Sequence, residues 1–71
     1  MTIKEVMGAA TGVQRGNVIS AIVRDGFSAT TAYSFCNGTR RPRTFYMDRL
    51  CAILRKYAGY TGTPGELYPD N

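Results

Sequence analysis

Three arginines, Arg40, Arg41 and Arg43, lie within four consecutive positions of this 71-residue chain. A guanidinium group is planar and always charged, so it binds two phosphate oxygens or the edge of a guanine through paired hydrogen bonds. The chain carries nine Lys and Arg against five Asp and Glu, a formal charge of +4, and seven of the nine cations are arginine. The cluster therefore predicts contact with a polyanion, with a solvated basic loop as the alternative.

The segment GFSATTAYSFCNG precedes the arginines and predicts a helix from Ser28 to about Cys36 with one apolar and one polar face. Ser28 is a suitable N-cap, and Gly38 can take the left-handed conformation that often ends a helix. The residues spaced for the inner face are Ala32, Phe35 and Cys36. The residues spaced for the outer face are Ala29, Thr30, Tyr33, Ser34 and Asn37. The outer face therefore comes directly before the arginine cluster.

The inventory of reactive side chains argues against catalysis. The chain has no histidine, and its acidic residues are isolated in the sequence, so no His-based triad or carboxylate pair can be assembled. Cys36 and Cys51 are too few for a thiolate zinc site, and their apolar surroundings predict small buried residues of a reducing cytosol rather than a disulfide. We therefore expect that the chain is not an enzyme and that it binds no metal, no cofactor and no small-molecule ligand.

Length and hydropathy limit the architecture and the location. A chain of 71 residues is expected to form one domain, 1–71, whose small core leaves it marginally stable, so that dimerisation would help. No run of residues approaches the 18 or so apolar positions of a membrane span, and the N-terminus lacks the apolar core of a signal peptide. These features predict a cytoplasmic protein that has no membrane partner.

Two helices are predicted before Ser28. A capping box in the segment TIKE starts the first, and Gly12 is its expected stop. Asn17 is the expected cap of the second, which runs from about 18 to 24 and ends at Asp25-Gly26. Residues expected on their buried faces are Ile3, Val6, Met7, Ala10, Val18, Ile22 and either Val23 or Ala21.

Two more helix signals follow the arginines. Thr44 is the expected cap of a fourth helix, whose apolar stripe is Met47, Leu50, Cys51, Leu54 and Tyr57. After the glycine-rich segment AGYTG, the segment TPGE repeats the capping-box pattern, with Pro64 at the first position of a fifth short helix or turn. Leu67 and Tyr68 would be held against the core. The sequence therefore predicts an all-α fold, a compact bundle of four to five short helices.

The sequence resembles the Cro and phage-repressor type of helix-turn-helix protein, the XRE-like or lambda-repressor-like DNA-binding domains. The resemblance covers roughly residues 17 to 68, is strongest over 26–54, and places the helix-turn-helix unit at about 18–37. The residues that carry it are Gly26, Phe27, Ser28, Ala32, Phe35, Asn37, Gly38, Arg40, Arg41, Pro42, Met47, Asp48, Arg49, Leu50, Cys51, Ile53, Leu54 and the closing TPGELY. The chain departs from the family at Ile22, where alanine is usual, at Val18, where a polar residue is common, and at 58–62, which looks like an insertion.

The resemblance implies a sequence-specific, double-stranded DNA-binding transcriptional regulator, a repressor of the kind carried by phages or mobile elements, with its third helix in the major groove. The implied DNA-binding residues are Ser28, Ala29, Thr30, Thr31, Tyr33, Ser34, Asn37, Arg40, Arg41 and Arg43. Simpler roles stay open for several of them. Ser28 can act as a cap alone, Thr30 and Thr31 can be solvated, Tyr33 can pack on the preceding helix, and Asn37 can serve as a turn residue.

A single recognition helix reads only a few base pairs, so the resemblance also implies a homodimer on a palindromic operator whose half-sites lie about 34 Å apart. The C-terminal region, with Tyr57, Tyr60 and Tyr68, is the expected dimer contact, although these tyrosines can equally belong to the core. An alternative function is a protein-interaction module derived from the same fold, antitoxin-like or an anti-repressor, whose arginines bind an acidic protein partner.

Overall fold

The computed structural model describes residues 1–69, so Asp70 and Asn71 of the expected domain lie outside the described part. Five helices follow one another along the chain: α1 (Ile3–Ala9), α2 (Gly12–Arg24), α3 (Ala29–Asn37), α4 (Thr44–Ala58) and α5 (Pro64–Leu67). No strand occurs in residues 1–69. The all-α prediction of four to five short helices is confirmed.

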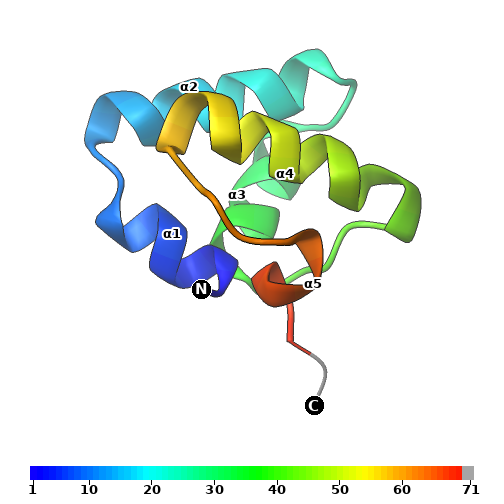
Figure 1. The fold of residues 1–71 in the computed structure, drawn as a ribbon. Helices are drawn as coiled ribbons and strands as arrows, with labels where there is room; N and C mark the ends of the chain where they lie inside the picture. The colour runs from blue at the N-terminus through cyan, green and yellow to red at the C-terminus, as the bar shows by residue number, and fades with distance from the viewer. Residues whose placement is uncertain (70–71) are drawn as a thin grey trace.

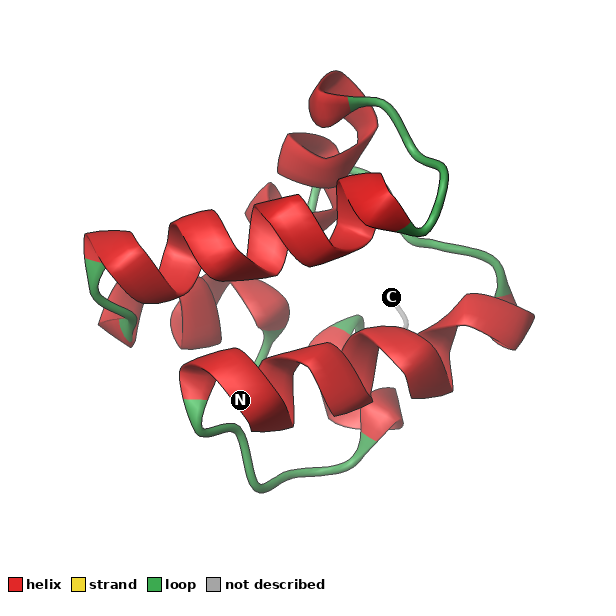
Figure 2. Ribbon diagram, turned by 90° about the horizontal axis from the view of Figure 1, so that it is seen from above, coloured by secondary structure: helices red, strands yellow, loops and turns green. Residues whose placement is uncertain are grey.

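The two longest helices, α2 and α4, lie side by side, and α1, α3 and α5 lie beneath them (Figures 1 and 2). The molecule measures 28 × 23 × 18 Å along its principal axes. The core lies between the two layers and is apolar, with every helix contributing to it. Its largest fully buried side chains are Ile3, Val18, Ile22, Leu50, Cys51, Leu54 and Leu67.

The first helix begins at the predicted capping box. The backbone N–H of Thr2 donates to Oε1 of Glu5 over 2.9 Å, and the N–H of Glu5 donates to Oγ1 of Thr2. The helix ends at Ala9, and Ala10 is extended. The prediction that Gly12 stops this helix is wrong, because a new capping box starts at Thr11 and makes Gly12 the first residue of α2.

The predicted start of the second helix near residue 18, with Asn17 as its cap, is also wrong. The backbone N–H of Thr11 donates to Oε1 of Gln14 over 2.9 Å, and the N–H of Gln14 donates to Oγ1 of Thr11 over 3.1 Å. The α2 helix then runs for 13 residues. Asn17 therefore lies exposed within the helix. The predicted burial of Val18 and Ile22 is confirmed, and Ala21 rather than Val23 completes the buried face.

The turn after α2 and the ends of α3 form as predicted. Asp25 closes α2, and Gly26 has a φ of 105°, a conformation that costs an L-residue energy because its Cβ approaches the backbone. Ser28 caps α3, and Gly38, with a φ of 78°, ends it in the left-handed conformation. The inner residues of α3, Ala32, Phe35 and Cys36, are buried.

The start of α4 differs from the prediction. Thr44 is the first helical residue rather than the cap, and Arg43 occupies the N-cap position without a side-chain hydrogen bond to the helix. The stripe of Met47, Leu50, Cys51 and Leu54 is buried as predicted, whereas Tyr57 is only half-buried. Tyr46 and Ile53 are buried in addition, so the apolar face is wider than the stripe predicts.

The fifth helix is short, and its Pro64 occupies the first helical turn as predicted. The predicted capping box is wrong, because the hydroxyl of Thr63 donates to Oε1 of Glu66 over 3.3 Å instead of accepting a backbone N–H. Leu67 and Tyr68 are buried, and the Tyr68 hydroxyl donates to the carbonyl of Phe35 over 2.6 Å. The end of the chain is thereby tied to α3.

The carboxylate of Asp25 joins the end of α2 to the start of α4. Oδ2 accepts a hydrogen bond from the Tyr46 hydroxyl over 2.7 Å and from Nε of Arg49 over 2.9 Å. The ring of Phe27, in the turn, packs edge-on against Tyr46, with ring centres 4.7 Å apart. The hydrogen bonds from Arg49 and then from Tyr46 hold the pKa of Asp25 below its ordinary value of 3.8.

We expect the Asp25 contact to depend on pH. A group whose pKa is lowered by folding stabilises the fold above its ordinary pKa, and this contribution is lost as the pH falls through the lowered pKa. The free energy of unfolding should therefore be higher for the wild type than for Asp25→Asn at pH 7, and the difference should shrink below about pH 4. Urea unfolding at several pH values measures it, and an undiminished difference at pH 2 would contradict the role of the charge.

A second variant isolates the phenol. Replacing Tyr46 by phenylalanine removes one hydrogen bond to the carboxylate and keeps the packing of the ring on Phe27, so the free energy of unfolding should fall by about 1 kcal/mol. Tyr33→Phe is the matched control. Tyr33 is 58% exposed, so loss of its hydroxyl should leave the free energy of unfolding unchanged. Equal losses in the two variants would argue against the contact.

Candidate nucleic-acid interface

The polar side of α3 faces solvent. Ala29 and Thr30 are exposed on its first turn, the Tyr33 side chain is 58% exposed one turn further on, and Asn37 is exposed on the last turn. These four residues recur at helical spacing and form one strip along the helix. Tyr33 also lines a hollow together with Gly12, Gly16 and Ile19 of α2, so contact with the preceding helix remains compatible with its exposure.

Ser28 and Thr31 interact with one another at the beginning of α3. The backbone N–H of Thr31 donates to Oγ of Ser28 over 3.1 Å, and that hydroxyl donates to Oγ1 of Thr31 over 3.0 Å. The interpretation of Ser28 as a cap is thereby confirmed. Thr31 is only partly exposed, so its hydroxyl belongs to the edge of the exposed strip rather than to its centre.

The carbonyl oxygen of Ser34 connects the arginine loop, residues 39–43, to α3. It accepts hydrogen bonds from the backbone N–H groups of Thr39 and Arg40 over 3.2 and 3.3 Å, and one from the Thr39 hydroxyl. The backbone of Ser34 therefore positions the loop, and the residue itself is half-buried. The first arginine is held at a fixed place beside the last turn of α3.

The arginine loop then runs back along α3 toward the turn at Gly26. Pro42 is buried, whereas Arg40, Arg41 and Arg43 are exposed. A single inward residue thus anchors the loop while the guanidinium groups remain at the surface. Between the loop and the first turn of α3 lies a hollow of about 360 Å³, whose lining includes Ser28 and Thr31, the three arginines and several aromatic residues.

A second hollow, of about 340 Å³, lies on the opposite flank of α3. Tyr33 and Asn37 border it on the α3 side, and Gly12, Gly16 and Ile19 border it on the α2 side. Arg15 also lines it, and its guanidinium donates to the carbonyls that end α1, at 2.7 Å from that of Ala10. The exposed strip of α3 therefore stands between two hollows.

The electrostatic character of these two hollows is positive. Among the residues that the structure describes as lining them, there are four arginines and no acidic side chain. Arg43 is also the N-cap of the 15-residue α4, whose first turn carries no side-chain cap. The N-terminal end of a helix has a partial positive charge, so α4 adds to the field of the arginines.

Phe45 is a site residue that the sequence patterns did not single out. It lies two positions after Arg43, lines the hollow beside the arginine loop, and is 79% exposed. The signal that could have found it is its register, since Phe45 falls off the apolar stripe of α4 that begins at Met47. An aromatic residue off the buried face of an amphipathic helix is exposed unless a neighbour covers it.

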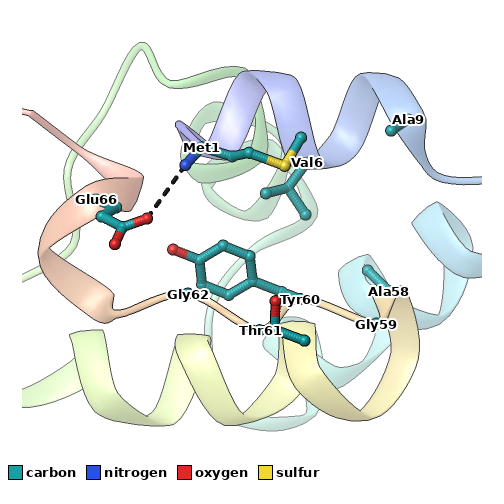
Figure 3. Close-up of a pocket in the computed structure, with 9 residues that line it drawn as sticks. All are labelled: Met1, Val6, Ala9, Ala58, Gly59, Tyr60, Thr61, Gly62 and Glu66. Atoms are coloured by element: carbon teal, nitrogen blue, oxygen red, sulfur yellow. Dashed lines mark hydrogen bonds and ion pairs between the residues drawn. The ribbon is translucent and has the colours of Figure 1, made fainter.

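Segment 58–62, expected to be an insertion, leads from the end of α4 toward α5. Gly59 ends α4 with a φ of 70°, and the buried Tyr60 donates from its hydroxyl to the carbonyl of Thr63 over 2.7 Å. Figure 3 shows the Tyr60 ring facing Met1 and Val6 across a hollow of about 220 Å³. A Cβ at Gly62 would collide with the Tyr60 hydroxyl, so this position requires glycine.

The chemistry of this third hollow is limited. Its amino group, that of Met1, lies 3.2 Å from Oε2 of Glu66, and the two charges neutralise one another (Figure 3). Tyr60 and Tyr68 are buried, which favours the core role that was one of the two interpretations of the C-terminal tyrosines.

Burial raises the pKa of Cys36 to about 11, and both cysteines are free and buried as predicted.

Comparison of the chain with protein-family models, with curated proteins and with solved structures finds no significant match. Within residues 1–69, no helix is both long and apolar enough to cross a membrane. The function must therefore be argued from the site itself.

Stability measurements can distinguish a hydroxyl group that caps α3 from one that is only exposed on its surface. Replacing Ser28 by alanine removes the cap of α3, so the free energy of unfolding should fall by about 1 kcal/mol. Replacing Thr30 by alanine removes an exposed hydroxyl that caps nothing, so stability should change by less than about 0.5 kcal/mol. Thermal or urea unfolding of both variants measures the difference, and a larger loss at Thr30 would reverse the assignment.

Proposed function

We propose that this chain is a sequence-specific, double-stranded DNA-binding transcriptional regulator, a Cro-like repressor in which α2 and α3 form a helix-turn-helix unit. The observation that carries the proposal is the exposed strip of α3 with positively charged hollows on both flanks. DNA presents base edges in a groove between two rows of phosphates. The arrangement of a polar strip between cationic edges is complementary to that surface.

The connection between α2 and α3 supports the proposal. Two helices joined by a short turn that contains a glycine are typical of the helix-turn-helix, whose second helix lies in the major groove. Here the turn glycine is Gly26, and the inner residues Ile22 of α2 and Ala32 of α3 are both fully buried in one core. Ala32 is small, which leaves room for an isoleucine at a position where the family usually has alanine.

The proposed role of each side chain follows from its chemistry. Thr30 and Tyr33 can exchange hydrogen bonds with base edges, and Asn37 can pair with both polar atoms of an adenine edge. Ala29 can contact the methyl group of a thymine. Arg40, Arg41 and Arg43 would bind backbone phosphates, which fixes the position of α3 but carries no sequence information.

The short length of α3 also favours a dimer on DNA. Nine residues of α3 extend for about 13 Å, which covers only a few base pairs of the major groove. Specific binding would then need two copies of the chain on a palindromic site. Such a complex would form in the cytoplasm, where the chromosome of a bacterial host is located.

The arginines test the phosphate binding. Replacing Arg40 or Arg43 by alanine should weaken binding to every duplex and reduce the slope of log K against log salt concentration by about 0.9 for each phosphate that is no longer neutralised. Lys56→Ala is the control, because it removes one charge at the opposite end of α4. Fluorescence anisotropy over a range of salt concentrations measures the slopes. Unchanged slopes for both arginine variants would contradict the proposed orientation.

The α3 strip tests sequence recognition. Thr30→Ala and Tyr33→Ala should change which duplexes are preferred. The ratio of the affinities for the best site and for an altered site should change by roughly tenfold in each variant, while the salt slope stays the same. Thr61→Ala removes an exposed threonine far along the chain and should change neither property. If the order of preferred sequences is the same in all three variants, α3 does not read the bases.

A further inference from the structure

Phe45 combines high exposure with a place beside the arginine loop. Its side chain is 79% exposed on the first turn of α4, the largest value among the exposed large apolar residues of the described chain. The neighbouring Tyr46 and Met47 are both buried, so the helix does not need Phe45 for its packing. The ring therefore offers apolar surface beside the arginine loop, where an anionic ligand would bind.

The position of Phe45 defines what that ligand must look like. Phe45 lines the hollow of about 360 Å³ together with Ser28 and Thr31 at the start of α3 and with Arg40 and Arg43 on the loop. The rest of the lining includes the aromatic residues Phe27, Phe35 and Tyr46. A molecule that fits this lining has anionic oxygens for the arginines and an apolar patch for the phenyl ring close to them. It also lies directly against the first turn of α3.

We propose that this hollow is a seat for one strand of the DNA backbone, in which the Phe45 ring packs against a deoxyribose and Arg40 and Arg43 bind the phosphates on either side of it. The inference rests on the proposed function. A DNA strand alternates phosphates with the carbon face of the sugar, which is the combination that the lining requires. The strand that borders the major groove passes beside any helix lying in that groove, and the hollow lies beside α3.

The position of the hollow beside the exposed strip of α3 favours DNA over an acidic protein as the occupant. The hydrogen bonds from Thr39 and Arg40 to the Ser34 carbonyl set the spacing between loop and helix. Thr31 borders the hollow and also lies at the edge of the exposed strip of α3, so the two surfaces are continuous. A strand in the hollow and bases against the strip are therefore parts of one duplex.

The test compares Phe45→Ala with the wild type on a fluorescein-labelled mixed-sequence duplex. Removal of the ring should reduce affinity by about tenfold for every sequence, because less apolar surface is buried against the sugar. The salt slope should stay unchanged, because no charge is removed. Phe45→Leu, which keeps most of the apolar surface, should retain most of the affinity. The melting temperatures of both variants should equal that of the wild type, because the ring is exposed.

Val13→Ala is the matched control, since Val13 is 76% exposed and lines neither hollow beside α3. If the wild type binds DNA and Phe45→Ala binds equally well, the backbone seat is wrong and the proposed function stands. A changed order of preferred sequences in Phe45→Ala would also overturn the seat, because it would show that the ring touches bases. If the wild type binds no duplex, the proposed function itself fails.

Discussion

The carboxylate of Asp25 is the contact on which the arrangement of the site depends. It receives the Tyr46 hydroxyl and the Arg49 guanidinium at the point where α2 ends, and thus fixes the start of α4 against the turn that leads into α3. Both ends of the segment between α2 and α4 are then set. Between these ends, the buried face of α3 packs in the core, and Pro42 and the hydrogen bonds to the Ser34 carbonyl hold the arginine loop beside it.

The side chains of α3 that pack in the core and those that we propose to bind DNA lie on opposite sides of the helix. Its inner side chains belong to an apolar core in which no buried polar atom of the described side chains lacks a hydrogen-bond partner. The outer side carries the groups that would meet DNA, and most of them take no part in packing. Changes of specificity on the outer strip should therefore cost little stability, which would let related sequences diverge in the sites that they prefer.

The parts of the fold that local signals determine could be predicted from the sequence. Ser28 and Gly38 bracket α3, and the inner spacing of Ala32, Phe35 and Cys36 identifies its buried face. The start of α2 could not, because Gly12 and Gly16 are poor helix formers and concealed the capping box at Thr11. The partners of Asp25, Tyr46 and Arg49, follow it by 21 and 24 positions, so the sequence contains no local signal for this contact. The hollow that Phe45 lines forms only when the arginine loop folds back, so it has no local signal either.

Selection of bound sequences from a pool of random duplexes at moderate salt tests most directly whether α3 reads base pairs from the major groove as part of a dimer. We predict enrichment of a palindromic sequence whose two half-sites lie about one helical turn apart. Retention of DNA without enrichment of any sequence would contradict base reading by α3. Enrichment of a single short site without symmetry would contradict the dimer.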